Sequence, residues 1–182
     1  MMPVAAYVSV GSNIQPEENI LEALRRLARR EHVAAVSLFY RTHPVTAEGR
    51  QALPSAEQPA YINGVWKLET ARDAGALKRE VLCAIEEEMG RARATDRYAP
   101  RNIDLDLLLY GDLVDARARL PEPHIRERAY IAVPLLDLEP DLRLPDTGDA
   151  LRDLPSSRTT LDMEPLVAFT ERMRNLIGGT EK

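Results

Sequence analysis

Two aspartates stand two residues apart in a segment that is otherwise apolar. Asp104 and Asp106 lie in the run 103–110, which is rich enough in leucine and isoleucine to form a buried strand. Successive side chains of a strand point to opposite faces, so both carboxylates project from one face and their apolar neighbours from the other. Because burying two unpaired carboxylates would cost several kcal/mol, the spacing predicts a site for divalent cations or a strong local network of ion pairs.

A basic segment precedes this pair. Between Gly90 and Arg101 there are four arginines and a single acidic residue, although the whole chain has a net charge of -5. These arginines are Arg91, Arg93, Arg97 and Arg101. Such a segment in an acidic protein indicates a specific anion, while chance clustering in an arginine-rich chain is the alternative. Together with the carboxylates, the arginines suit phosphoryl-type transfer, in which magnesium ions neutralise a polyphosphate and guanidinium groups stabilise its charge.

A second polar face is predicted on the strand Tyr61–Thr70. Tyr61 offers a flat stacking surface, and Asn63 on the same face offers an amide that both donates and accepts hydrogen bonds. This pair suits recognition of a flat heterocycle, and a tyrosine at a sheet edge beside an asparagine is the purely structural alternative. Among the three histidines of the chain, only His124 is a functional candidate.

The order of the predicted elements indicates an α+β fold. Strands are expected at Ala5–Val10, Val33–Tyr40, Tyr61–Thr70 and around the two aspartates, and the first should end at the turn cluster Gly11–Asn13. Helices are expected at about Pro16–Arg30, Asp73–Met89 and, interrupted or restarted at Pro134, Arg126–Leu138. This β-α-β-β-α-β order can form a ferredoxin-like antiparallel sheet with packed helices, in three α/β/α layers.

The length and composition describe a single domain. The chain has 182 residues, of which 45% are apolar, and we expect a core over about 5–145 with a C-terminal extension over 146–182. Helical periodicity over Met163–Ile177 predicts that this extension packs on the core. The single cysteine, Cys83, excludes internal disulfides and cysteine-based zinc sites.

Charge and hydropathy limit the partners that we expect. The net charge of -5 argues against general affinity for nucleic acid or anionic membranes, and no apolar run approaches the length of a membrane span. Without a leader-like segment before the first strand, we expect a soluble cytoplasmic protein, as a monomer or a weak homodimer.

A series of short stretches between Ala5 and Pro145 forms a specific pattern. In chain order they are Tyr7–Asn13, Phe39–Thr42, Gln58–Gly64, Glu86 with Gly90–Arg93, Pro100–Asp106, Arg119–His124, Glu127–Tyr130, Pro134–Leu135 and Pro140–Asp141. The pattern resembles 6-hydroxymethyl-7,8-dihydropterin pyrophosphokinases, enzymes of folate biosynthesis. The resemblance implies a ferredoxin-like core and transfer of pyrophosphate from ATP to the pterin hydroxymethyl group, with two Mg²⁺ ions taking part and AMP leaving.

The resemblance also implies roles for individual residues. Asp104 and Asp106 would hold both magnesium ions, and Arg91 and Arg101 would contact phosphates and assist transfer. Contacts with ATP are implied for Glu86, Arg93, His124 and Arg128. Contacts with the pterin are implied for Thr42, Pro44, Val45, Tyr61, Asn63 and Tyr130, with the ring between the two tyrosines. The resemblance places a histidine that contacts ATP between Gly111 and Tyr130. Counting forward from Gly111 assigns it to His124, whereas counting back from Tyr130 arrives at Glu122.

Two other functions stay open on the sequence alone. The first is a related metal-dependent nucleotidyl or phosphoryl transferase that acts on another substrate, from which pterin recognition by Tyr61 and Asn63 would separate this chain. The second is a ferredoxin-like ligand-sensing or interaction module without catalysis. The simultaneous presence of both aspartates and of Arg91 and Arg101 counts against that module.

Overall fold

The computed structural model describes residues 2–44, 53–55, 59–90, 101–158 and 163–179. Its strands are β1 (Val4–Ser12), β2 (His32–Val36), β3 (Tyr40–Thr42), β4 (Tyr61–Thr70), β5 (Asp104–Tyr110) and β6 (Met163–Pro165). Its α-helices are α1 (Pro16–Ala28), α2 (Ala74–Ala76), α3 (Cys83–Glu88), α4 (Ala129–Leu138) and α5 (Val167–Gly178). A π-helical stretch, Leu77–Leu82, joins α2 to α3, and short 3-10 turns are formed by Pro123–Arg126, Leu151–Asp153 and Pro155–Ser157.

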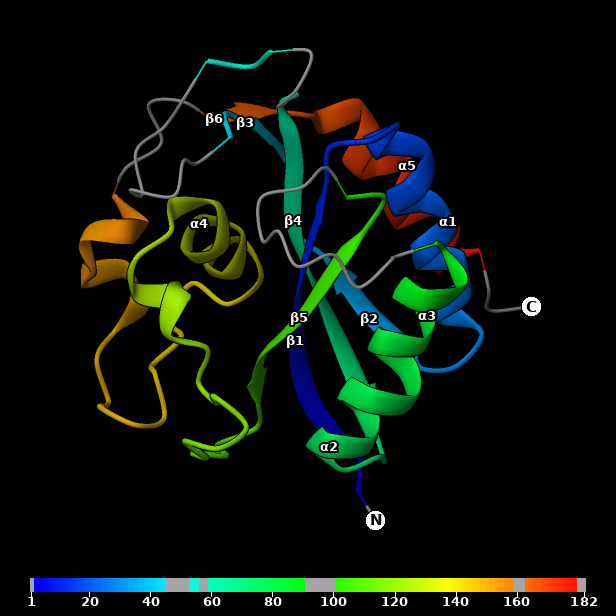
Figure 1. The fold of residues 1–182 in the computed structure, drawn as a ribbon. Coiled ribbons are helices and arrows are strands. Elements are labelled where there is room, and N and C mark those ends of the chain that lie inside the picture. The colour runs from blue at the N-terminus through cyan, green and yellow to red at the C-terminus, as the bar shows by residue number, and fades with distance from the viewer. Residues whose placement is uncertain (1, 45–52, 56–58, 91–100, 159–162, 180–182) are drawn as a thin grey trace.

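The sheet is antiparallel and lies between two helical layers. The strands follow the order β5-β1-β4-β3-β6, and β2 pairs with the other half of the same edge of β4. Along β5, β1, β4 and β2 this is the strand order of a ferredoxin-like core. Helix α4 covers one face, and α1, α3 and α5 cover the other (Figure 1). The predicted α+β architecture is therefore confirmed.

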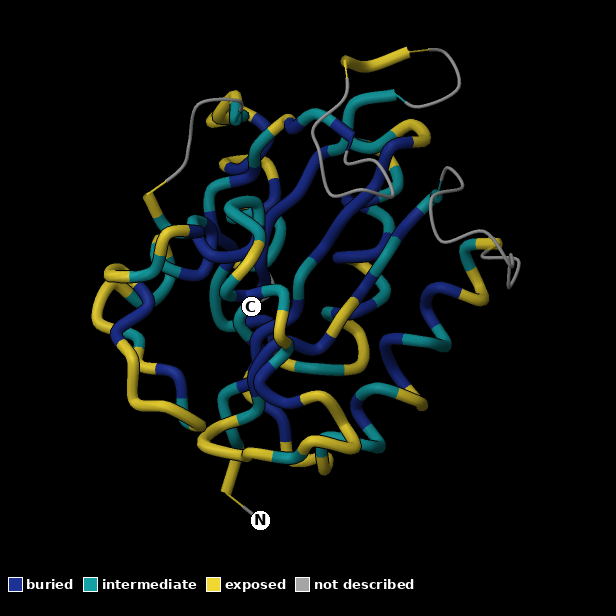
Figure 2. Tube along the Cα trace, turned by 60° about the vertical axis from the view of Figure 1, so that its left-hand side comes forward, coloured by how far each residue is buried: buried dark blue, intermediate teal, exposed yellow. Residues whose placement is uncertain are grey.

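Alternation of side chains divides the interior into two apolar clusters. On the face of α1 and α3, Val8 and Leu105 belong to a core around Trp66, while Tyr7 and Val65 pack with α4 on the opposite face. Each cluster lies between the sheet and the helices that cover that face, and Figure 2 shows many of the exposed residues in the connecting segments. The alternation predicted for the two aspartates is confirmed, because the apolar residues beside them are buried in the first cluster.

Two strand boundaries differ from the prediction. The first strand runs beyond Val10, because Gly11 and Ser12 pair with Asn63 and Ile62 of β4 instead of turning. The segment expected as one strand, Val33–Tyr40, is split into β2 and β3.

The split has a physical cause at Ser37. The Ser37 amide donates to the Val65 carbonyl at 3.0 Å, and the Ser37 hydroxyl accepts from the Val65 amide at 2.8 Å. The Ser37 hydroxyl thus takes the place of a backbone carbonyl in the hydrogen-bond ladder between the strands. Beyond it, the Phe39 ring turns into the first core and lies against Gly64.

The C-terminal region and α4 also differ in part from expectation. Residues Met163–Pro165 form a strand and not the first turn of a helix, and Val167 is 59% exposed. The expected packing of this region is confirmed, because Phe169 and Met173 of α5 are buried in the first core. Pro134 does not interrupt α4, which runs unbroken from Ala129 to Leu138 and is mostly apolar.

Helix α4 is fixed to the sheet just beyond its C-terminal end. The Tyr7 hydroxyl donates to Glu139 Oε1 at 2.9 Å, and Lys67 forms an ion pair with the same oxygen. Burial, followed by the bond to Glu139, raises the pKa of Tyr7. The hydrogen bond from Lys67 is the largest influence on Glu139 and lowers the pKa of that carboxyl.

In the described part of the chain, no helix has both the length and the apolar character to cross a membrane.

The contact between Gly64 and Phe39 gives a stability prediction. A Cβ added at Gly64 would collide with the Phe39 ring, which is fully buried. Gly64→Ala should therefore lower the free energy of unfolding by about 1–3 kcal/mol, the usual cost of overpacking a core. Urea denaturation measures this change. Gly178→Ala is the matched control, because nothing lies within 4 Å of its added Cβ, and an equal loss of stability in both variants would contradict the explanation.

Candidate active site

A pocket of about 330 Å³ opens between one end of the sheet and the N-terminal end of α4. Strands β1, β3, β4 and β5 and the residues next to their ends contribute most of it, and the chain around the start of α4 contributes the rest. The predicted residues that line it are Thr42, Pro44, Tyr61, Asn63, Arg101, Asp104, Asp106, His124, Arg128 and Tyr130. The fold thus brings together side chains that lie up to 88 residues apart in the chain.

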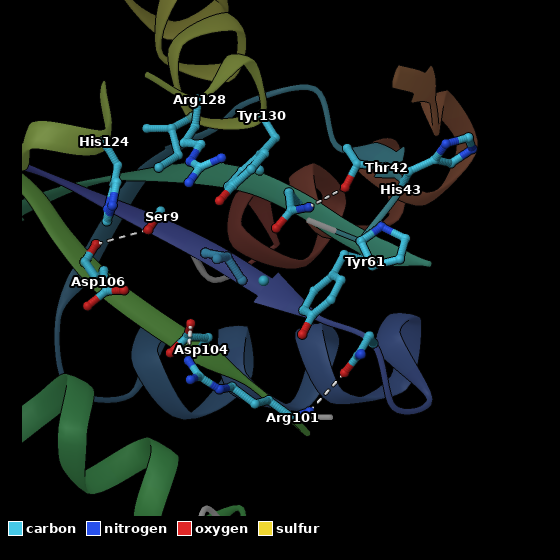
Figure 3. Close-up of a pocket in the computed structure, with 17 residues that line it drawn as sticks. Ser9, Thr42, His43, Tyr61, Arg101, Asp104, Asp106, His124, Arg128 and Tyr130 are labelled. Atoms are coloured by element: carbon cyan, nitrogen blue, oxygen red, sulfur yellow. Dashed lines mark hydrogen bonds and ion pairs between the residues drawn. The ribbon is translucent and has the colours of Figure 1, made fainter. Parts of the chain in front are cut away.

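The pocket has two chemically different ends. Asp106 and His124 lie at one end, and Thr42 and Tyr61 lie at the other (Figure 3). Arg128 lies on the side of α4, with Tyr130 beside it. One end therefore carries a carboxylate charge beside an imidazole, while the other offers a ring and hydrogen-bonding groups.

The two aspartates share one face of β5, as their spacing predicts. Both line the pocket, and Asp106 lies opposite Ser9 of β1, whose hydroxyl donates to the Asp106 carbonyl at 3.4 Å. Asp104 Oδ2 accepts from Arg101 Nη1 at 2.7 Å, and both side chains are about one quarter exposed. Carboxylate oxygens that reach a polar, partly open pocket are the donors that a hard cation such as Mg²⁺ prefers. The residues present therefore fit magnesium.

Arg101 is held in place through its backbone. Its amide donates to Asn13 Oδ1 at 2.8 Å, and its carbonyl accepts from the Asn13 amide at 3.3 Å. The next residue, Asn102, is anchored by its carbonyl to the Ser12 hydroxyl at 2.6 Å and by its side chain to the Met89 carbonyl at 2.9 Å. The end of β1 thus fixes the point from which the Arg101 guanidinium reaches Asp104.

The polar end of the pocket is organised around Asn63. Its Nδ2 donates to Thr42 Oγ1 at 2.7 Å, and both side chains are largely buried. Asn63 pairs with Gly11 across β1 and β4, and a Cβ on Gly11 would lie 2.9 Å from Asn63 Oδ1. Glycine is therefore needed at this position to leave room for the amide group.

Two tyrosines complete this part of the site. Tyr61 begins β4, and Tyr130 lies in the first turn of α4, with both rings facing the pocket (Figure 3). Burial raises the pKa of Tyr61, with a smaller opposite effect from Arg101. Burial also raises the pKa of Tyr130; Arg128 opposes this shift, and Asp104 and Asp106 add to it. Both phenols therefore stay neutral and can serve as stacking surfaces.

His124 is oriented by a neighbouring carboxylate. Its Nδ1 lies 2.9 Å from Glu122 Oε1, and the same oxygen accepts from Arg119 Nη2 at 2.9 Å. The Glu122 side chain is only 12% exposed, and its backbone amide donates to the Leu108 carbonyl of β5. Counting along the sequence left two candidates for this position, His124 and Glu122. His124 lines the pocket, and Glu122 supports it from behind.

Glu86 lies behind the edge strand β5. Among the described residues that line the pocket Glu86 does not appear, and its side chain is buried. Its Oε1 accepts from the Leu105 amide at 2.8 Å, directly between the two aspartates. In this structure Glu86 braces the outer edge of β5 and so supports the aspartates from behind.

Three predicted site residues lie outside the described residues: Arg91, Arg93 and Val45. Sequence reasoning missed several pocket residues: Ser9, Val10, Gly11, Asn13, His43, Gly64 and Ile131. Strand alternation on β1 could have suggested Ser9 and Gly11, which share the pocket face, once β1 was known to pair with β4 and β5.

Comparison with known proteins identifies relatives over most of this chain. The family profile of 7,8-dihydro-6-hydroxymethylpterin-pyrophosphokinase (HPPK) matches residues 7–140. The 2-amino-4-hydroxy-6-hydroxymethyldihydropteridine pyrophosphokinase of Pseudomonas aeruginosa is 42% identical over 146 residues, which are 77% of this chain and 83% of that relative. The enzyme of the same name from Haemophilus influenzae is 35% identical over 149 residues, or 79% of this chain and 87% of the relative.

A solved structure shares the fold. The crystal structure of Plasmodium falciparum HPPK-DHPS A437G with SDX-DHP matches with a TM-score of 0.58 at 12% sequence identity. The match covers 82% of this chain and 44% of that chain, so this chain spans less than half of that protein. With the profile matched over most of its length and relatives of this identity, the chain belongs to the 7,8-dihydro-6-hydroxymethylpterin-pyrophosphokinase family.

Proposed function

We propose that this chain transfers the pyrophosphoryl group of ATP to 6-hydroxymethyl-7,8-dihydropterin and releases AMP, with two magnesium ions at Asp104 and Asp106 and assistance from arginines. Membership of the family makes the chain a pyrophosphokinase of folate biosynthesis. The acceptor, the number of ions and the part played by each residue belong to the proposal.

One observation carries the proposal. A single pocket joins the paired carboxylates and Arg101 to an end formed by Asn63 and two tyrosines. A polyphosphate with its cations suits the charged end, and a flat ring with polar edges suits the other. A transfer reaction between two substrates requires both ends within reach of each other.

The acceptor end would recognise the pterin by shape and hydrogen bonding. Tyr61 and Tyr130 would stack on the ring, and Asn63 would bond its polar edge. Since Nδ2 of Asn63 already donates to Thr42, the amide has a fixed orientation before the substrate arrives. Pro44, which lines this end, and Val45 are proposed to complete the pterin contacts.

The charged end would bind ATP and align it for transfer. Asp104 and Asp106 would hold the magnesium ions, which when bound neutralise phosphate charge and lower the cost of bringing a hydroxyl oxygen close to it. Arg101 and Arg91 would contact the transferring phosphates, while Arg93, Arg128 and His124 would contact the rest of ATP. Contact of Glu86 with ATP stays a prediction, and its bond with the Leu105 amide supports the further proposal that it steadies the aspartates.

The reaction would be a displacement at the β-phosphorus of ATP. The hydroxymethyl oxygen of the pterin attacks this phosphorus, and the bond from it to the oxygen that bridges the α- and β-phosphates breaks. AMP leaves with that oxygen, and the hydroxyl proton is lost from the acceptor. Exclusion of water by the bound substrates and the chain around them would prevent simple hydrolysis of ATP.

Two expectations from the sequence stay predictions. They are the cytoplasmic location and a monomeric or weakly dimeric state without nucleic-acid or membrane partners.

The reaction predicts a specific product. Incubation with ATP and Mg²⁺ should form AMP only when 6-hydroxymethyl-7,8-dihydropterin is present, and chromatography of the nucleotides measures it. AMP, not ADP, distinguishes pyrophosphoryl from phosphoryl transfer. Nucleotide turnover that ignores the pterin would instead indicate a transferase with another acceptor, and no turnover by folded protein would favour a module without catalysis.

The assignment of the metal ligands predicts a selective loss of turnover. Asp106→Asn should lower kcat by about 100-fold or more, the scale on which one group facing developing charge contributes. Steady-state AMP formation at several Mg²⁺ concentrations measures it. Asp112→Asn removes an exposed carboxylate from the turn after β5 and should change nothing. Normal kcat and normal Mg²⁺ dependence in Asp106→Asn would show that the ions bind elsewhere.

The polar end predicts a separation between the two substrates. Asn63→Ala should abolish pterin binding and leave ATP binding unchanged, as titration calorimetry with each ligand measures. Gly11→Ala should have a weaker effect in the same direction, because its Cβ would lie 2.9 Å from Asn63 Oδ1 and displace the amide. Equal weakening of ATP and pterin binding in either variant would remove Asn63 from pterin recognition.

A further inference from the structure

The bend between β2 and β3 is bonded to the C-terminal helix at a buried residue. The Phe39 amide donates to Thr170 Oγ1 at 3.0 Å, and the Phe39 carbonyl accepts from the Leu166 amide at 2.8 Å. Both partners belong to α5 or its N-cap, beyond residue 140, where the family profile ends. Phe39 and Thr170 are fully buried, and the Phe39 and Phe169 rings meet edge to face at 5.9 Å.

Arg174 of α5 extends the same connection around the edge of the sheet. Its Nε donates to the Val36 carbonyl at 3.1 Å, and its Nη2 lies 3.4 Å from Asp137 Oδ2. That oxygen also accepts from the Leu38 amide at 2.6 Å. Asp137 is on α4, so the bend is held from both helical layers at once (Figure 1).

The bend leads directly into a strand of the pocket. Three residues after Phe39, Thr42 lines the pocket and accepts from Asn63 Nδ2. Along β3, Thr42 is paired with Met163 of β6, which immediately precedes α5. The three-residue strand β3 is therefore fixed at its first end by α5 and along its outer edge by β6.

We propose that Thr170 and Arg174 are positioning residues for the pterin end of the pocket, acting through the bend and β3. This inference rests on the proposed function, because the property that should depend on Thr170 and Arg174 is binding of the proposed acceptor, the pterin. Neither side chain lines the pocket. Their effect is to hold Thr42 where its hydroxyl can orient Asn63.

The variants are chosen to separate positioning from stability. Thr170→Val keeps the shape of the side chain and removes the acceptor of the Phe39 amide, while Thr170→Ser keeps that acceptor. Arg174→Gln removes the contacts with Val36 and Asp137 from a partly exposed site, so it tests the proposal even if Thr170→Val fails to fold. Arg172→Gln is the matched control on the same helix, because Arg172 pairs with Glu17 of α1 and not with the bend.

The kinetic measurement is the KM for each substrate, with the full-length protein. We expect Thr170→Val and Arg174→Gln to raise the KM for 6-hydroxymethyl-7,8-dihydropterin about tenfold, the effect of one displaced hydrogen bond, with the KM for ATP unchanged. Thr170→Ser and Arg172→Gln should retain normal values. An unchanged pterin KM, or equal increases for pterin and ATP, would overturn the proposal.

Amide hydrogen exchange gives a measurement that does not depend on turnover. The amides of Tyr40–Thr42 should exchange faster in Thr170→Val and Arg174→Gln than in the control. If the unaltered protein formed no AMP with the pterin, the proposed function would fail, yet faster exchange would still support positioning of β3 by α5. Unchanged exchange at these residues would overturn it.

Discussion

Gly11 lies opposite Asn63 in the pairing of the two central strands, and this register decides what each face of the sheet can hold. It places Ser9 and Gly11 on the pocket face, while Val8 and Val10 enter the core. A shift of one residue in this pairing would move the side chains of a strand to the opposite face of the sheet, which would bury polar groups and expose apolar ones. The apolar face therefore specifies the site, because its burial fixes the only register in which the polar side chains meet.

Two pocket side chains, Arg101 and His124, already contact carboxylates. Arg101 is paired with Asp104, so neither of these two charges is uncompensated in the partly buried site, and His124 contacts Glu122. When a ligand brings phosphates together with cations, the phosphates can replace a carboxylate as the partner of an arginine, and the cations can replace the arginine as the partner of the carboxylate. The net buried charge then does not increase. The backbone bond from Arg101 to Asn13, and the bond from the Asn102 side chain to the Met89 carbonyl, hold the backbone on which this exchange takes place.

Local patterns predicted the elements well where a single periodicity governed them. The strand Tyr61–Thr70 and the shared face of Asp104 and Asp106 followed from alternation alone. The split at Ser37 could not be foreseen, because it depends on a side chain that bonds to a partner strand. The orientation of Glu86 depends likewise on an edge amide of β5. Thr42, Pro44 and Tyr130 entered the site by resemblance, since only the fold brings them to the pocket.

The bend at Phe39 acquires its partners from far along the chain. Its bond with Thr170 joins residues 131 positions apart, a non-local contact whose loop must close before the bond can form. During synthesis the central strands can pair long before residue 170 exists. The contacts that complete this edge of the pocket therefore come from residues that are synthesised after all of β1 to β5, so the polar end of the pocket depends on a later part of the chain than the central strands do.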